Sequence, residues 1–519
     1  MTLQAYRVEQ VRSAERVVLA QVAEGALMQR AAAGLAAICS AELRGRRGLV
    51  TGAAVVLLIG AGNNGGDALW AGARLARRGA AVRALLLSGS PHAEGLAALL
   101  AAGGRALGPI TGPDPEVESG QHAEACRLLA AADLVIDGIV GLGGSAGLRD
   151  PAATLLAGLA SADDGGPLMV AVDLPSGVDA DGGTTPASHV RADVTVTFGA
   201  LKPCLLLPPA ARAAGRVELV DIGLGPYLPP VPAVDRLEPG DVRRGWPVPG
   251  PDDDKYSRGV VGVVAGSAGY TGAAVLAVGG ALRAGAGMVR YLGPQQPADR
   301  VRARWPEAVV GPGRVQAWVL GSGLDPDAGD GQAEAVIDAL RHGLPTVLDA
   351  GALALLDRPG VRALLGPHAV LTPHAGELAR LLGATSVGPG APASGAPAEV
   401  TRAQVQADPL GHARRAVELT GATVLLKGSC TVIAAPDGRH RSQADAPAWL
   451  ATAGAGDVLA GVLGTLLAAG LDPLDAAGLA AMVHGRAAAR ASAGGPIVAE
   501  DVITALPATI AALLGPARG

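Results

Sequence analysis

Short apolar runs with the length of β-strands alternate with segments of helical spacing along most of this chain, and this alternation limits its fold more than any other feature. Residues 8–43 have helical spacing, and a buried strand at 53–59 and a helix over 67–78 follow them. Further strands are predicted at 82–87, 134–137, 168–173, 194–198, 260–265, 318–321, 346–349, 369–371 and 424–427, with helices from 457 to 514. This order is typical of parallel α/β sheets, whose functional residues gather in the loops after the carboxyl ends of the strands.

A proline-dense stretch interrupts the alternation near the middle of the chain. Residues 225–232 and 247–251 are rich in proline and have no apolar period, which is typical of a stiff interdomain linker. A chain of 519 residues is also too long for one core. We therefore predict a first α/β domain over 1–226, a linker over 227–250 and a second α/β domain over 251–519. Residues 383–397 are predicted to form a surface insertion without chemical function.

Charge and composition exclude several classes of protein. A net charge of -5, without a cluster of basic and aromatic residues, gives no field for nucleic acid. No apolar run reaches the ~18 residues that a membrane span needs, and residues 1–15 lack the pattern of a secretory signal. The four cysteines have no metal-binding spacing, so we expect buried thiols in a reducing, cytoplasmic compartment. Only 2% of the residues are aromatic, so Ala, Val and Leu must fill the cores.

A few residue types are so rare that their positions draw attention. The only asparagines are Asn63 and Asn64, and the only lysines are Lys202, Lys255 and Lys427. Arginine, which is abundant here, cannot replace lysine where a compact point charge is needed, and no other neutral side chain puts an amide carbonyl where asparagine does. The sites that keep these residues are therefore candidates for function. For Lys255, which lies in the charged run 252–258, a solvated cluster is the favoured interpretation.

The glycine pattern Gly60-x-Gly62-x-x-Gly65 follows a predicted strand and precedes a helix. Such a loop lets backbone amides approach a phosphate at a helix N-terminus, as in Rossmann-like domains. The acidic residue that dinucleotide-binding dehydrogenases carry at the end of the next strand is missing from residues 84–88. A nicotinamide dehydrogenase is therefore disfavoured, whereas a Rossmann-like sheet that holds the phosphates of a nucleotide stays attractive.

Three motifs give the first domain a family resemblance. These are Asn63-Asn64-Gly65-Gly66-Asp67, the run 173–179 (Asp-Leu-Pro-Ser-Gly-Val-Asp) and the run 198–203 (Phe-Gly-Ala-Leu-Lys-Pro). Over roughly the first 225 residues the chain resembles the YjeF N-terminal family of NAD(P)H-hydrate epimerases. It departs from the usual Met-Glu-Asn-Ala at residues 28–31, where it has Met-Gln-Arg-Ala.

The resemblance implies an epimerase site. It implies that the hydrated cofactor is bound by Asn63, Asn64, Gly65, Gly66, Asp67, Gly141, Leu142, Gly143, Gly144, Ser145, Ala146, Gly147 and Asp173. It also implies a potassium ion held by Asn64, Asp137 and Ser176, whose oxygens suit a group I cation. Asp173 would be the acid–base group, with Lys202 assisting it. The alternative for Asp173 is a residue that only stabilises the turn at 175–177.

The second domain carries a different set of motifs. The run 452–457 (Thr-Ala-Gly-Ala-Gly-Asp) leads into a long apolar helix, where small residues bare the first amides for a phosphate and an Asp lies beside the transferring phosphoryl group. This element resembles that of the ribokinase-like fold. With the runs 372–377 (Thr-Pro-His-Ala-Gly-Glu), 427–428 (Lys-Gly) and 270–273 (Tyr-Thr-Gly-Ala), residues 237–514 resemble the ADP/ATP-dependent NAD(P)H-hydrate dehydratases. Two small residues differ from the family pattern, Ala375 and Ala453.

This second resemblance implies two groups of binding residues. The hydrated cofactor would be bound by Ala273, Gly323, His374 and Asp457, and the adenine nucleotide by Lys427, Gly428, Ser429, Cys430, Thr431 and Gly456. Asp457 would activate the substrate hydroxyl for phosphorylation with Mg²⁺ present, because phosphate is a better leaving group than hydroxide. The alternatives are a helix-capping role for His374 and a solvated strand-end charge for Lys427.

Together the two resemblances predict a bifunctional enzyme. It would interconvert the R and S hydrates of NADH and NADPH and dehydrate the S form at the expense of ADP or ATP, between which the sequence does not choose. We expect a homo-oligomer that acts on small molecules and has no nucleic-acid or membrane partner. A vitamin kinase of the ribokinase-like fold, with a non-catalytic interaction module as its first domain, is the alternative.

Overall fold

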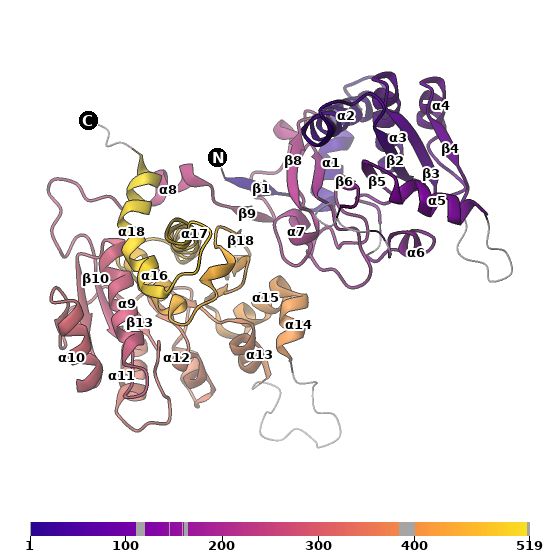
Figure 1. Cartoon of the computed structure of the whole chain (residues 1–519). Coiled ribbons are helices and arrows are strands. Elements are labelled where there is room, and N and C mark those ends of the chain that lie inside the picture. Colours follow the sequence, from indigo (N-terminus) through magenta and orange to yellow (C-terminus); the bar gives the residue numbers. More distant parts are fainter. Residues whose placement is uncertain are drawn as a thin grey trace, which may run out of the picture. The chain divides into compact units, whose positions relative to one another are not determined.

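The computed structural model describes residues 2–110, 120–144, 146–157, 159, 165–383 and 400–515. Contacts divide the chain into an N-terminal unit, Gln4–Ala233, and a C-terminal unit, Val234–Gly519 together with Met1–Leu3 (Figure 1). Residues 227–250 were expected to be a linker, but from Val234 onward they fold into the C-terminal unit. They form strand β9 (Val234–Arg236) and helix α8 (Pro239–Gly245), because Val242 and Trp246 are apolar enough to be buried in its core.

The N-terminal unit is built on a seven-stranded parallel sheet with the order β4-β3-β2-β5-β6-β7-β8. Its strands are β2 (Ala54–Ile59), β3 (Ala81–Leu86), β4 (Arg105–Leu107), β5 (Leu134–Gly138), β6 (Leu168–Val172), β7 (Val194–Phe198) and β8 (Arg216–Val220). Its helices are α1 (Val8–Leu19), α2 (Ala26–Arg47), α3 (Asn63–Arg77), α4 (Ala93–Ala101), α5 (Gly120–Ala130), α6 (Ala152–Leu156) and α7 (Ala210–Ala213). Strand β1 (Leu3–Ala5) spans the boundary between the units.

Both faces of this sheet are covered. One apolar cluster joins α1, α2, α3 and α4 to the sheet, and a second joins α5 and α6 to its other face. The helical region predicted over residues 8–43 is two helices, since the chain turns at Gly25, whose φ of 75° is favourable only for glycine. Helix α3 carries Trp70, the only tryptophan of this unit, which packs against the first cluster.

The C-terminal unit is also an α/β sandwich. Its sheet runs β9-β18-β17-β16-β15-β14-β13-β10-β11-β12, and neighbours from β16 to β12 are parallel, whereas β17 is antiparallel to both of its neighbours. The remaining strands are β10 (Val260–Val264), β11 (Met288–Tyr291), β12 (Val309–Val310), β13 (Ala317–Leu320), β14 (Thr346–Leu348), β15 (Ala369–Leu371), β16 (Thr423–Leu426), β17 (Thr431–Ala434) and β18 (His440–Gln443).

Helices cover both faces of this second sheet. One core cluster contains residues of α9 (Thr271–Ala284), α10 (Gln295–Arg304), α16 (Ala455–Ala468), α17 (Pro473–Ser492) and α18 (Ala499–Leu514). The other contains residues of α11 (Gln332–Arg341), α12 (Gly351–Ala354), α13 (Ala375–Gly383), α14 (Arg402–Ala407) and α15 (Pro409–Thr420). The predicted insertion at 383–397 lies outside the described residues apart from Gly383.

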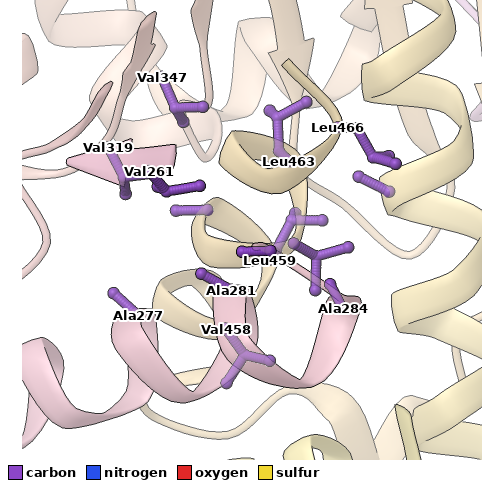
Figure 2. Packing of buried hydrophobic residues seen from close by; sticks show 14 of the residues in the cluster. Val261, Ala277, Ala281, Ala284, Val319, Val347, Val458, Leu459, Leu463 and Leu466 are labelled. Atoms are coloured by element: carbon purple, nitrogen blue, oxygen red, sulfur yellow. The ribbon is translucent and has the colours of Figure 1, made fainter. Parts of the chain in front are cut away.

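The helices α9 and α16 lie side by side (Figure 2). Helix α16 packs on strands β10, β13 and β14, and α9 packs on β10 and β11. Leu459 and Leu463 of α16 and Ala277 and Ala281 of α9 belong to one buried apolar cluster (Figure 2). A Cβ atom added at Gly461 would lie 2.1 Å from the carbonyl oxygen of Ala277, so glycine is required for this close approach. The packing anchors α16, whose first turn carries Asp457.

The predicted α/β fold with parallel sheets is confirmed, and Ala, Val and Leu make up most of both cores, as expected. Across the described part of the chain, every helix is too short or too polar to cross a bilayer.

Candidate functional site

A cavity of about 490 Å³ opens in the N-terminal unit, at the carboxyl ends of its strands. Residues of α1, of the start of α3 and of the loops after β5, β6 and β7 line it. The lining residues are Arg12, Glu15, Ala61, Gly62, Asn63, Asn64, Asp67, Ile139, Val140, Gly141, Leu142, Gly143, Gly144, Asp173 and Phe198. Most of the predicted substrate-binding residues of this unit therefore surround one cavity.

Asp173 follows β6 and is held from several sides. Its Oδ1 accepts hydrogen bonds from Lys202 Nζ, from Thr197 Oγ1 at 3.1 Å and from the N–H of Phe198 at 3.4 Å. Its φ of 68° lies in the left-handed region, which is costly for a residue other than glycine and is tolerated best by Asp and Asn. The folded state thus tolerates an unfavourable backbone conformation at Asp173, and its hydrogen bonds hold the carboxylate at the cavity wall.

Lys202 is 1% exposed and uses all of its donor capacity on the protein. Besides Asp173, its ammonium donates to Thr197 Oγ1 at 3.0 Å and to the carbonyl oxygen of Phe198 at 3.1 Å. An ammonium has three donors, so this lysine has none left for another partner. It neutralises Asp173 and fixes the position of that carboxylate.

The three residues expected to hold potassium lie at neighbouring strand ends. Asp137 is the penultimate residue of β5, and its carboxylate accepts from the Ser176 N–H at 2.8 Å, from Ser176 Oγ at 2.6 Å and from the Ile139 N–H at 3.2 Å. Asn64 donates its Nδ2 to the carbonyl oxygen of Val172 at 2.7 Å, so its Oδ1 acceptor is turned elsewhere.

The chemistry of this donor set fits a cation. Burial raises the pKa of Asp137 to about 6, although its hydrogen bonds from Ser176 and Ile139 lower it. No ion pair reaches Asp137 within the described ranges, so a monovalent cation would offset a buried charge that the side chains leave uncompensated. The same described ranges contain no cluster of three or more His, Cys, Asp or Glu side chains that could hold a metal, and only one of the three groups here is a carboxylate.

Different residues of the loop at 141–147 contact different parts of the N-terminal unit. A Cβ added at Gly141 would lie 2.3 Å from Asn64 Oδ1, so the loop packs directly on that amide. The carbonyl oxygen of Leu142 accepts from Arg12 at 3.1 Å, which ties the loop to α1. Gly147 instead donates its N–H to Gly177, and Ser145 lies outside the described residues.

Arg12 and Glu15 of α1 were missed by the sequence analysis although both line the cavity. Their helix has ordinary amphipathic spacing and no motif, so the sequence gives no signal that it reaches the strand ends. Burial raises the pKa of Glu15, the Lys202 ammonium lowers it, and the Asp173 carboxylate raises it further, with a net upward shift.

In the C-terminal unit, Lys427 lies at the centre of a second charged cluster. It follows β16 and its Nζ lies 2.7 Å from Asp349 Oδ1 and 3.8 Å from Glu377 Oε2. A Cβ added at Gly456 would lie 3.3 Å from this Nζ, so the start of α16 lies close to the lysine ammonium. Burial lowers the pKa of Lys427, but Asp349, Glu377 and Asp457 raise it more, so the lysine stays charged.

Asp457, in the first turn of α16, belongs to the same cluster. Burial raises its pKa to about 7, Asp349 adds to the rise, and Ser322 and Lys427 oppose it. Asp349 was not among the predicted site residues. It ends the predicted strand at 346–349, so the rule that found Asp173 at its strand end would also have found it.

His374, Gly323 and Ala273 were expected to contact substrate. His374 Nδ1 accepts from the N–H groups of Gly376 and Glu377 at 3.0 and 3.1 Å, which is the helix-capping arrangement. A Cβ added at Gly323 would lie 2.6 Å from the Cβ of Ala273, so these two residues touch. Of the nucleotide-binding residues predicted at 428–431, the first three form the turn from β16 into β17, and Thr431 begins β17. Cys430 Sγ lies 3.7 Å from Arg236.

Comparison with known proteins adds family membership to this geometry. A family model described as YjeF-related protein N-terminus matches residues 24–204, and one described as NAD(P)H-hydrate dehydratase matches residues 261–507. A bifunctional NAD(P)H-hydrate repair enzyme of Mycobacterium tuberculosis is 44% identical over 91% of this chain and 90% of its own length. Its relative from Mycobacterium leprae is 43% identical over 94% of each chain. The chain belongs to the family of bifunctional NAD(P)H-hydrate repair enzymes.

The two matched regions of this NAD(P)H-hydrate repair family fall in different units of the structure. An NAD(P)H-hydrate epimerase of Clavibacter sepedonicus is 46% identical over 42% of this chain and 90% of its own length. A solved ADP/ATP-dependent NAD(P)H-hydrate dehydratase of Bacillus subtilis, co-crystallised with ATP/Mg²⁺, is 24% identical with a TM-score of 0.44, over 53% of this chain and 96% of that one.

Proposed function

We propose that the chain repairs hydrated NADH and NADPH in two steps, one in each unit. The N-terminal unit interconverts the R and S hydrates, and the C-terminal unit dehydrates the S hydrate at the expense of ADP or ATP. The observation that carries this proposal is the 44% identity to a bifunctional repair enzyme over 91% of the chain. A kinase with a non-catalytic first domain is disfavoured, because the cavity of the N-terminal unit keeps a strained, lysine-paired carboxylate.

In the epimerase unit, Asp173 is the acid–base group of the proposal. Lys202 holds its carboxylate at the cavity wall, and a proton acceptor must be fixed within reach of the proton that it takes. The backbone amides at the start of α3 and the loop at 141–147 would bind the phosphate-bearing part of the substrate, since a helix N-terminus suits an anion. A potassium ion held by Asn64, Asp137 and Ser176 would compensate the buried Asp137 charge.

In the dehydratase unit, Asp457 would accept the proton of the substrate hydroxyl as the hydroxyl oxygen attacks the terminal phosphorus of the nucleotide, and the bond from that phosphorus to the leaving AMP or ADP breaks. The phosphate would then leave with the electron pair of the C–O bond while a ring proton passes to water, which restores the double bond. Lys427 lies near the carboxylates of Asp349 and Glu377. Together with residues 428–431 and Gly456, it would also bind the phosphates of the nucleotide. His374, Ala273 and Gly323 would contact the substrate.

Magnesium would neutralise the phosphates during this transfer. Asp349 is the oxygen donor that fits it: its Oδ2 has only a 3.4 Å contact with Ser322, whereas its Oδ1 is engaged by Lys427 and Thr372. Carboxylate oxygens combined with substrate phosphates are the ligands that magnesium prefers.

The test uses a mixture of NADHX epimers and the absorbance of the reduced nicotinamide. We expect repair of both epimers with ADP or ATP and none without nucleotide. Asp173→Asn should leave the R epimer to its spontaneous rate while the S epimer is still repaired, since Asn tolerates the left-handed backbone but cannot exchange a proton. Glu94→Gln, which removes an exposed carboxylate of the same unit, is the control and should behave as wild type. Repair of neither epimer by wild-type protein would refute the proposed function.

A further inference from the structure

Asp67 is a buried carboxyl group that the roles given above leave unexplained. It is 8% exposed, and its Oδ1 has no hydrogen-bond partner among the described residues. A buried polar atom without a partner costs free energy, so a fold that keeps one needs a reason for it. Binding to the phosphate region, the role implied by resemblance, does not supply that reason, because a carboxylate would repel a phosphate.

The position of Asp67 points to the reacting end of the cavity. Asn63 and Asp67 are four positions apart in the sequence, so both lie on the same face of α3, and both line the cavity. Asp67 also lies close enough to Asp173 and Glu15 for their charges to act on it. The side chain therefore shares the cavity wall with the proposed acid–base group.

The charges around Asp67 leave it without a counterion. The charged groups that face it are Glu15 and Arg12 on α1, Asp173 after β6 and Lys202 after β7, while His92 at the start of α4 packs beside Gly66. Lys202 is committed to Asp173, and Arg12 is exposed and bound to Leu142. Burial and the carboxylates of Asp173 and Glu15 hold the pKa of Asp67 well above its usual range, against a lowering by Lys202.

We propose that Asp67 is a second acid–base group of the epimerisation, one that carries a proton in the free protein and gives it to the hydrated ring. This inference rests on the proposed function. Inversion at a carbon that bears both a hydroxyl group and the ring nitrogen needs two proton transfers. Asp173 and Asp67 supply one each.

The step balances as follows. Asp173 takes the proton of the hydroxyl group, the oxygen forms a carbonyl, and the bond between this carbon and the ring nitrogen breaks. Its electron pair goes to the nitrogen, which takes the proton of Asp67. After rotation of the open chain, the reverse transfers close the ring on the opposite face, so both carboxyl groups regain their starting states and no other reactant is consumed.

The test compares Asp67→Asn, Asp67→Glu and the exposed control Glu94→Gln in the full chain. Asn has the same shape and cannot exchange a proton, so we expect kcat for epimerisation to fall about 100-fold with little change in KM. Asp67→Glu should retain more of the kcat than Asp67→Asn. Wild-type kcat should decline as the pH rises through the pKa of Asp67, because the acid loses its proton, and this decline should be absent from Asp67→Asn.

Two further readouts separate the possible results. Infrared spectra should show a protonated carboxyl band in wild type that Asp67→Asn lacks, and dehydration of pure S hydrate should be unchanged in every variant, which reports that the chain is folded. A raised KM with unchanged kcat, or no difference in that band, would overturn the role of Asp67 while leaving the repair function intact. Absence of epimerisation by wild type would instead refute the proposed function. If Asp67→Asn does not fold, the kcat and pH profile of Asp67→Glu decide: both identical to wild type would contradict the proposal.

Discussion

Each unit pairs a lysine with a carboxylate at the end of a strand, and the two lysines differ in how many of their donors the protein uses. Lys202 donates to three protein oxygens and is 1% exposed. Lys427 has one hydrogen bond to Asp349 and a longer contact with Glu377, and its side chain is 22% exposed. Lys202 is therefore suited to fixing Asp173, whereas Lys427 can turn toward an incoming phosphate.

The proton affinity of Asp457 leads to a prediction at the residue scale. A base must be unprotonated to accept the proton of the hydroxyl group, and the pKa of Asp457 is raised to about 7 by burial and by Asp349. We expect kcat/KM for dehydration of the S hydrate to rise as the pH increases through about 7. Asp349→Asn removes the repulsion and frees Lys427 to approach Asp457, so the midpoint of that rise should move to lower pH.

The measurement is the pH profile of dehydration with subsaturating substrate, which reports groups of the free protein. Asp338→Asn, which removes an exposed carboxylate of α11, serves as the control and should keep the wild-type midpoint. A midpoint that Asp349→Asn leaves in place would mean that another group controls the profile.

At the scale of elements, the proposed cation site would depend on the junction between the start of α3 and the loop after β5. Gly141 packs on the amide of Asn64, where a Cβ atom would lie 2.3 Å from Oδ1. We expect Gly141→Ala to displace that amide and to raise the potassium concentration needed for half-maximal epimerisation at least ~10-fold, a loss of about 1.4 kcal/mol in cation binding.

The matched control is Gly143→Ala in the same loop. A Cβ added there meets only Arg12, at 3.5 Å, which is an ordinary contact. Its potassium response should equal that of wild type, and dehydration of S hydrate should be unaffected in both variants. Equal potassium responses of Gly141→Ala and Gly143→Ala would contradict a role of Asn64 in binding the cation.

The elements also separate what the sequence predicts from what it does not. The central strands were predicted to within a residue or two because they are rich in apolar residues, and β2 and β6 are continuous apolar runs. Strand β18 (His440–Gln443) was missed because it is polar although fully buried. Its Arg441 is compensated by Asp235 and Asp475 through ion pairs that no local pattern reveals. Helix α3 begins four residues before its predicted start, because tertiary packing overrides the low helix propensity of glycine.

The residues of the candidate sites also fall into those that the sequence predicts and those that it does not. Asn63, Asp137, Asp173 and Lys427 were predicted because strand ends and rare residue types mark them. Glu15 and Arg12 could not be predicted, since their helix reaches the cavity only through the tertiary fold. The sequence also could not predict that the Asp67 carboxyl group has a buried oxygen without a hydrogen-bond partner, because this burial depends on the tertiary fold.

At the scale of the whole molecule, each unit has its own sheet and its own apolar cores, which predicts that the two activities are separable. A mixture of Asp173→Asn and Asp457→Asn chains should repair both hydrates, because each chain keeps one working site and the intermediate can diffuse between chains. Asp173→Asn alone should leave the R hydrate, and Asp457→Asn alone should restore neither hydrate.

The measurement is the extent and rate of NADH recovery from mixed epimers with ADP, at fixed total protein. The mixture should approach the rate of wild type diluted two-fold. Failure of the mixture, with each variant retaining its remaining activity, would mean that the substrate must pass within one chain.

The placement of tryptophan gives the two sites separate optical reporters. Trp70, the sole indole of the N-terminal unit, lies on the helix whose first turns carry Asn63, Asn64 and Asp67, and Trp246, Trp305, Trp318 and Trp449 belong to the C-terminal unit. A chain in which those four are replaced by phenylalanine would fluoresce only from the epimerase side. Quenching by a reduced nicotinamide would then time its arrival at that cleft without interference from the other.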